Sequence, residues 1–240
     1  MITRFFIFLI LLFSFPSISF CYISIGVDDW PPYVKMDSSG LIDRKVSCLL
    51  DKIGIVPIYK KYPWPRIYKM IKRGELDMSY PWAKTPQRSR EVLFSYPILY
   101  DKEVFIYLSS NPIKWRVLSD LSNYRVGAQI GYSHVELLER NSVIPAVQVR
   151  TESQLMGMLF SKRIDVFPIN LAVLEKLISS LSDEQASQLK ISEFVLSENS
   201  MHLIFSNNNK GREIMNMINQ IITSGVCGKI ALTAPSKGFW

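Results

Sequence analysis

The segment from Gly74 to Pro97 constrains the fold most, because a helix end, a strand and a new helix start follow one another directly within it. Gly74 is suited to end the preceding helix, since glycine adopts the left-handed conformation of such an end without steric cost. Residues 76–80 then predict a strand, and Thr85 and Pro86 are typical of an N-cap followed by the first residue of a helix. Helices and strands that alternate in this way indicate an α/β fold.

Arg88 is the candidate for binding an anion at this helix start. Free backbone N–H groups at a helix N-terminus and a planar guanidinium both favour anions, and arginine can bind both oxygens of one carboxylate. The alternative is that Arg88 belongs to a solvated run with Arg90 and Glu91. The spacing alone supports both interpretations.

Three short motifs in this segment resemble the signature of a known protein family. Gly-Glu-Leu-Asp at 74–77, Thr-Pro-Gln-Arg at 85–88 and Phe-Ser-Tyr-Pro at 94–97 follow the order typical of extracytoplasmic solute-binding proteins of the polar amino acid type. Looser agreement extends over nearly all of the mature chain. The resemblance implies an α/β, two-lobed periplasmic-binding-protein fold of type II, in which each lobe is a mostly parallel sheet flanked by helices and a two-strand hinge joins the lobes.

The order of predicted elements divides the chain into two lobes. Long strands are expected to cross between the lobes near 107–112 and 196–201. We expect residues 20–109 and 199–240 to form the first lobe and residues 110–198 the second. Two crossings imply a hinge, about which the lobes close on a ligand.

The first residues predict an export signal. A short positively charged start precedes an apolar run over 5–15, and Ser17 and Ser19 have the spacing of small residues before a cleavage site. The run is shorter than the roughly 20 residues that span a bilayer. A lipoprotein needs a small residue before its cysteine, whereas phenylalanine precedes Cys21. We therefore expect residues 1–19 to be a cleaved signal peptide and the mature protein to be soluble and periplasmic.

Composition limits the classes of function. With 48% hydrophobic residues among 240, the chain can bury one large core or two small ones. The formal net charge is +7, but the basic residues are scattered among acids, so nucleic acid is not an expected partner. The sequence has no nucleophile elbow, zinc helix motif or phosphate loop, and His134 and His202 lack metal-ligand or catalytic spacing. We expect no cofactor and no bound metal.

The three cysteines, Cys21, Cys48 and Cys227, have no metal-binding spacing. Export permits a disulfide, which would leave one cysteine over. Cys48 and Cys227 are the expected pair, because both lie on predicted helices of the same lobe. Two buried free thiols remain the alternative.

Three successive strand–helix units each place a tryptophan near the end of a strand, at Trp30, Trp64 and Trp82. Open α/β sheets bind ligands at this edge, and aromatic walls stack on planar or cationic groups. We expect these tryptophans, with Tyr33 and Ala83, to line a pocket for a small zwitterion or anion. The Trp-Pro-Pro-Tyr loop of Trp30 and Tyr33 also resembles a ligand-wall loop of the family. The alternative for Trp30 is that it only covers the edge of the lobe.

Ser133 is the expected N-cap of a helix in the second lobe, which gives a second helix start suited to an anion. The segment resembles a family loop of Val-Gly, three variable residues, and then Gly with Ser or Thr, which supplies backbone N–H groups to a ligand carboxylate. Here Tyr132 stands between Gly131 and Ser133, so the match is displaced by one residue. The alternative is an ordinary turn between a strand and a helix.

Asn170 falls where the family carries an aspartate that holds the ammonium of the ligand. Asparagine is uncharged and accepts only through its carbonyl oxygen. Either another acid supplies the charge, Asp29 being the nearest by loop position, or the ligand has no ammonium at that end. The basic balance of the first lobe and the two anion-suited helix starts favour the second alternative.

The resemblance implies a monomeric solute-binding protein that is not an enzyme. It would capture a polar amino acid or related small carboxylate and deliver it to the membrane permease of an ABC importer. The first alternative is an enzyme on the same scaffold, similar to a cyclohexadienyl dehydratase, with Asp77, Glu75 or Asp29 as a general acid or base. The second alternative is a sensor that binds the ligand without transporting it.

Overall fold

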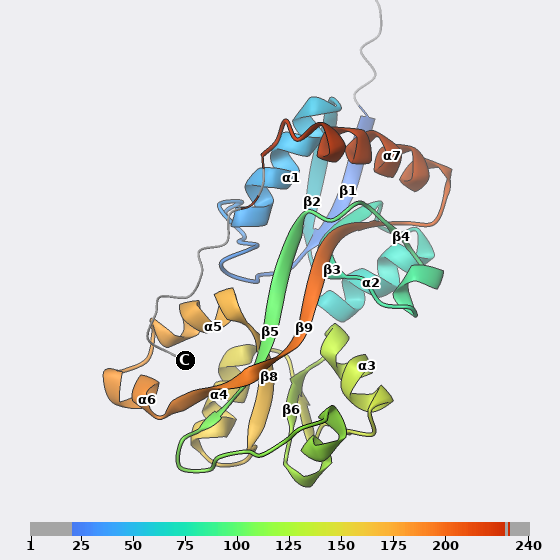
Figure 1. Ribbon diagram of the computed structural model, residues 1–240. Coiled ribbons are helices and arrows are strands. Elements are labelled where there is room, and N and C mark those ends of the chain that lie inside the picture. The colour runs from blue at the N-terminus through green and yellow to red at the C-terminus, as the bar shows by residue number, and fades with distance from the viewer. Residues whose placement is uncertain (1–20, 229, 231–240) are drawn as a thin grey trace, which may run out of the picture.

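The structure is a computed structural model that describes residues 21–228 and 230. The predicted signal peptide, residues 1–19, lies outside the described residues. Figure 1 shows an upper group of elements, the first lobe, and a lower group, the second lobe, with two long strands that pass through both.

The elements of each lobe are as follows. The first lobe contains β1 (Cys21–Val27), α1 (Leu41–Lys52), β2 (Ile55–Lys61), α2 (Trp64–Arg73), β3 (Met78–Ala83), the 3₁₀ turn η1 (Arg88–Arg90), β4 (Leu93–Phe94) and α7 (Asn209–Ser224). The second lobe contains the 3₁₀ turn η2 (Leu118–Asn123), β6 (Gly127–Gln129), α3 (Ser133–Arg140), β7 (Val147–Val149), α4 (Glu152–Phe160), β8 (Val166–Asn170), α5 (Leu171–Ile178) and α6 (Asp183–Ser187). The strands that run through both lobes are β5 (Leu99–Leu108) and β9 (Leu189–Phe205).

The sheets are parallel within each lobe and antiparallel at the long strands. In the main sheet the strands follow the order β2-β1-β3-β9-β5-β8, and β4 pairs with β9. Strand β1 is parallel to β2 and β3, and β6 is parallel to β7. Strand β9 is antiparallel to β3 and β5, and β8 is antiparallel to β5. The expected parallel arrangement therefore holds inside the lobes, while the connecting strands make the main sheet mixed.

The two long strands connect the lobes as one antiparallel ribbon. Strand β9 is a single strand of 17 residues, so the crossing expected near 196–201 lies in its interior. Strand β5 pairs with β8 of the second lobe from Glu103 to Tyr107. The chain therefore enters the second lobe within β5, before the crossing expected near 107–112. Shifts in the β5–β9 register follow Glu103 and Val104.

Two helices cover the first lobe with their apolar faces. Helix α1 fully buries Val46, Leu49 and Leu50, and α2 fully buries Ile67. Each such side chain contributes about 1.5–3 kcal/mol by leaving water. Gly74 ends α2 with a φ of 75°, as the sequence predicts for a left-handed helix end. Within residues 21–228, none of the helices combines the length and apolar character needed to cross a membrane.

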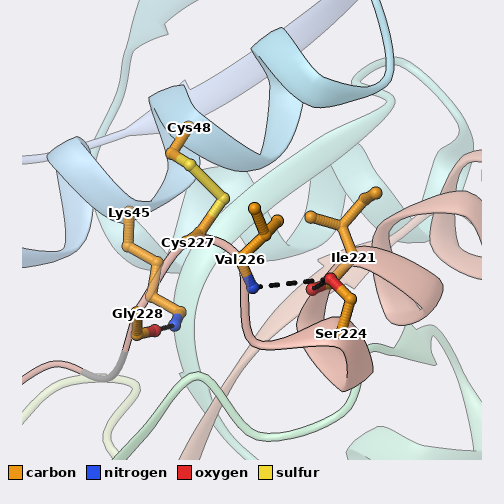
Figure 2. Close-up of a disulfide and its surroundings, with 7 residues drawn as sticks. All are labelled: Lys45, Cys48, Ile221, Ser224, Val226, Cys227 and Gly228. Atoms are coloured by element: carbon orange, nitrogen blue, oxygen red, sulfur yellow. Dashed lines mark hydrogen bonds between the residues drawn. A yellow bond between two sulfur atoms is a disulfide. The ribbon is translucent and has the colours of Figure 1, made fainter.

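A disulfide joins Cys48 of α1 to Cys227, just beyond α7, with Cα atoms 5.9 Å apart (Figure 2). The expected pair is confirmed, and the alternative of two free thiols is wrong. Lys45, one turn earlier on α1, donates a hydrogen bond to the carbonyl of Gly228 beside the bridge. The cross-link spans 179 residues, and in the chain-entropy model a loop of that length stabilises the fold by about 5 kcal/mol. It fastens the end of the described chain to the first lobe.

Candidate ligand-binding site

A cavity of about 50 Å³ lies between the lobes, where strand ends and helix starts from both lobes meet. It brings together seven of the eight residues selected from the sequence. Those residues are Trp30, Trp64, Trp82, Ala83, Arg88, Ser133 and Asn170, and the cavity is completed by Pro81, Glu103, Gly131, Tyr132 and Met201. The sequence-based argument for a shared rim therefore identified most of the wall.

Three tryptophans form the aromatic part of the wall. The rings of Trp64 and Trp82 meet edge to face, with centroids 5.6 Å apart and planes at 84°. Trp82 donates its indole N–H to Ser79 at 2.8 Å, so its orientation is fixed. Trp30 is only 6% exposed and packs against Tyr132 of the second lobe, with centroids 6.4 Å apart. These rings exclude water from the cavity, which strengthens electrostatic interactions inside it.

Arg88 lies in this wall and not in a solvated run. Its guanidinium stacks over Trp82, 5.2 Å from the ring centroid. Nη1 donates to the carbonyl of Ala83 at 3.0 Å, and Nη2 donates to the carbonyl of Gly131 at 2.6 Å. The backbone N–H of Arg88 donates to the Thr85 hydroxyl at 3.2 Å, which is the predicted cap, although a 3₁₀ turn follows where an α-helix was expected. Burial lowers the pKa of Arg88, which nevertheless stays protonated at neutral pH.

Two hydrogen bonds join the lobes beside the cavity. The first is the bond from Arg88 to Gly131, a residue whose φ of 83° favours glycine. The second runs from the indole N–H of Trp30 to Glu152 Oε1 at 3.3 Å, and the hydroxyl of Tyr132 donates to the same oxygen at 2.9 Å. The described arrangement is therefore a closed one, in which the first lobe touches the start of α3 and the start of α4 directly.

Ser133 lies at the cavity, but the prediction that it is the N-cap of α3 is wrong. The N-cap is Tyr132, which has extended backbone angles and makes no capping hydrogen bond with its side chain. The tyrosine inserted between Gly131 and Ser133 moves the helix start back by one residue. Ser133 is consequently the first residue of α3, where backbone N–H groups have no partner within the helix. The helix start keeps its capacity for an anion.

Asn170 ends β8 and is 3% exposed, and its side-chain Nδ2 has no hydrogen-bond partner in the structure. A buried donor without a partner costs about 1–3 kcal/mol. The residue is the N-cap of α5 but does not cap that helix with its side chain. The side chain lies near enough to Asp101 to lower the pKa of that acid, but Nδ2 makes no full hydrogen bond there and could turn to an acceptor in the cavity.

Glu103 is the charged residue of the cavity that sequence reasoning missed. It is 2% exposed and lies on β5, between β8 and β9. His134 Nδ1 lies 3.0 Å from Oε1, while the Ser197 hydroxyl and the Asn199 amide donate to Oε2 at 2.8 and 3.0 Å. Burial by itself raises the pKa of Glu103, but these contacts outweigh it and lower the pKa below the ordinary value. The available signal was an acid directly before the apolar run 104–108 of the same strand, because isolated glutamates are rarely buried.

Tyr33 and Asp29 do not line the cavity. Tyr33 is fully buried, and its hydroxyl donates to Asp101 at 2.8 Å, so its polar end is already engaged inside the first lobe. Its ring packs behind Trp30, with centroids 4.6 Å apart. Asp29 is exposed and lies 3.6 Å from Lys61. Asp29, which the sequence suggested as a partner for a ligand ammonium, therefore lies at the surface. Among residues 21–228 and 230, no group of three His, Cys, Asp or Glu could hold a metal.

Asp101 gives the fold a dependence on pH that can be measured. Burial raises its pKa to about 6 from 3.8, although the hydroxyl of Tyr33 acts to lower it. Because the folded protein holds this proton more tightly than the unfolded chain, the stability contributed by the proton is complete below pH 4 and is lost as the pH rises to about 6. A shift of about two units corresponds to roughly 3 kcal/mol.

We expect Asp101→Asn to reduce this dependence. Urea unfolding at pH 4 and pH 7 measures the free energy of unfolding. Between these pH values the wild type should lose about 3 kcal/mol more of it than the variant does. Tyr33→Phe should show a larger pH dependence of stability than the wild type, because it removes a donor that stabilises the ionised carboxylate of Asp101. Equal pH dependence in the wild type and Asp101→Asn would contradict the assignment.

Comparison with known proteins identifies the family. Residues 23–231 match the model of the bacterial extracellular solute-binding proteins, family 3. A search of curated protein sequences found no match.

Solved structures similar to this chain include three complexes with small ligands. An ancestral arginine-binding protein bound to glutamine is 18% identical, with a TM-score of 0.69 over 85% of this chain and 91% of that one. A substrate-binding protein of an ABC uptake transporter from Streptococcus pneumoniae, with bound histidine, is 19% identical, with a TM-score of 0.70 over 85% and 86%. The AvGluR1 ligand-binding domain with glutamate is 16% identical, with a TM-score of 0.71 over 88% and 93%.

At these identities the likenesses establish the fold alone, and they confirm the expected two-lobed, type II periplasmic-binding-protein architecture. The family model, in contrast, spans most of the sequence. The chain therefore belongs to the family 3 bacterial extracellular solute-binding proteins.

Proposed function

We propose that the protein is exported and captures a polar amino acid or a related small carboxylate between its lobes, for delivery to the membrane permease of an ABC importer. The observation that carries the proposal is the position of Arg88, a partly buried cation in an aromatic wall, opposite the start of α3 at Ser133. A guanidinium and free helix N–H groups are complementary to a carboxylate. The solved structures bound to glutamine, histidine and glutamate support a ligand of this class.

Ligand entry requires the lobes to move apart. A cavity of about 50 Å³ holds only a few water-sized groups, which is less than an amino acid needs. We propose that residues 20–109 and 199–240 move as one lobe and residues 110–198 as the other. The movement would bend β5 and β9 near Glu103, where their register shifts, and would break the bond from Arg88 to Gly131.

Binding is favoured over the enzymatic alternative by the state of the acids. Asp77 pairs with Lys210 at 2.9 Å, outside the cavity, and Glu75 and Asp29 are exposed. Glu103 lies in the cavity, but its lowered pKa keeps it ionised and makes it both a poor proton donor and a weak base at neutral pH. A stable anion suits recognition of a ligand.

Arg88→Lys should weaken ligand binding by about 1.5–3 kcal/mol, because a point charge cannot bind both carboxylate oxygens at once. Isothermal titration calorimetry measures the effect. Arg90→Lys, an exposed neighbour of the same residue type, is the matched control and should bind like the wild type. Affinity of Arg88→Lys equal to that of the wild type would remove Arg88 from the binding site.

The proposed function is tested by identifying the ligand. Native mass spectrometry of protein purified without refolding should show a bound small molecule with a carboxylate, and calorimetry against the standard amino acids and a dicarboxylate panel should give dissociation constants of about micromolar or lower. If the protein binds no member of either panel, the proposal is wrong.

A further inference from the structure

The cavity contains a buried acid, Glu103, as well as the partly buried cation Arg88. Glu103 and Asn170 are direct partners in the antiparallel ladder between β5 and β8, and both line the cavity. Opposite residues of such a pair have Cβ atoms about 5 Å apart on the same face of the sheet. A carboxylate therefore lies beside Asn170, one strand away, although residue 170 itself is uncharged.

Glu103 has acceptor capacity left for a ligand. An ionised carboxylate offers about four acceptor sites on its two oxygens. Ser197 and Asn199 occupy Oε2, whereas His134 is the single protein partner of Oε1 in the described structure. One site on Oε1 consequently remains for a donor that enters the cavity.

His134 holds the carboxylate of Glu103 in place. The backbone N–H of Gln129 donates to His134 Nε2 at 3.4 Å, so Nε2 is an acceptor. Nδ1 is then the nitrogen that donates to Glu103, at 3.0 Å. Because His134 is only 1% exposed, it fixes the position of Oε1 at the cavity.

The other charged groups near Glu103 leave its charge in place. Arg88 is close enough for Glu103 to raise its pKa, but its Nη1 and Nη2 donate to the carbonyls of Ala83 and Gly131. Asp101, two residues earlier on β5, receives the hydroxyl of Tyr33. A cationic group of a ligand would thus meet a buried carboxylate that has an acceptor site left on Oε1.

We propose that Glu103, positioned by His134, binds the ammonium of the ligand, and that Nδ2 of Asn170, which makes no full hydrogen bond in the described structure, donates to a ligand oxygen. This inference rests on the proposed function and specifies its ligand as a carboxylate that also bears an amine. The sequence alone favoured a ligand without an ammonium, because Asp29 was the acid considered as its partner. The position of Glu103 in the cavity reverses that expectation. Arg88 and Glu103 then bind the two opposite charges of one zwitterion.

The test compares each amino acid with the same acid lacking its α-amine. L-glutamine, L-histidine, L-arginine and their deaminated analogues are titrated into the wild type, Glu103→Gln and the control Glu198→Gln. Glu198 is a surface acid on β9, 2.9 Å from Lys102, and does not line the cavity. A double variant, Glu103→Gln with Asn170→Asp, returns a carboxylate to the opposite position of the ladder.

The wild type and Glu198→Gln should bind the preferred amino acid about 10- to 100-fold more tightly than its deaminated analogue. Glu103→Gln should lose that preference while it binds the analogue as the wild type does, and the double variant should regain part of it. Thermal unfolding followed by circular dichroism checks that each variant folds. The wild-type comparison requires no variant, so it can overturn the ammonium site even if Glu103→Gln does not fold.

Three results would overturn the inference or its basis. Equal affinity of the wild type for an amino acid and its deaminated analogue would exclude an ammonium site while leaving carboxylate capture intact. An equal loss of both affinities in Glu103→Gln would make Glu103 a structural residue. A wild type that binds neither class would refute the proposed function itself.

Discussion

The antiparallel pairing of β5 with β9 is the interaction on which the rest of the structure depends. It runs from the Leu99–Met201 pair in the first lobe to the Leu108–Leu189 pair in the second. Glu103 lies within this ribbon, opposite Ser197 on β9 and Asn170 on β8. The ladder therefore both connects the lobes and places a carboxylate at the point where they meet.

The charges at this meeting point would couple closure of the two lobes to ligand binding. An unpaired charge in a protein interior costs several kcal/mol, so each must be hydrogen-bonded. Arg88 is satisfied by one carbonyl from each lobe, and Glu103 by donors from β9 and α3. A zwitterion would replace the contact between Arg88 and Gly131 with a charged partner and use the remaining acceptor site of Glu103. Ligand binding and lobe closure would then stabilise each other, because the same groups serve both.

The sequence predicted those features that local rules control. Gly74 marked the end of α2, and the prediction of both cysteines on helices of one lobe indicated the Cys48–Cys227 bridge, although Cys227 lies just beyond α7. The tryptophans were found because ligand-facing residues follow parallel strands at one edge of a sheet. The missed features depend on contacts between distant segments. Glu103 is stabilised by donors 31 to 96 residues away, and the role of Tyr33 depends on Asp101. Neither spacing nor residue type reveals such pairs.

A crystal structure with the preferred amino acid bound tests the central claim most directly. The account predicts the ligand carboxylate at about 3 Å from the guanidinium of Arg88 and from a backbone N–H at the start of α3. It also predicts the ammonium at about 3 Å from Oε1 of Glu103, with Asn170 bonded to a ligand oxygen. A ligand whose carboxylate has no contact with Arg88, or whose ammonium lies away from Glu103 on another acid, would contradict the account.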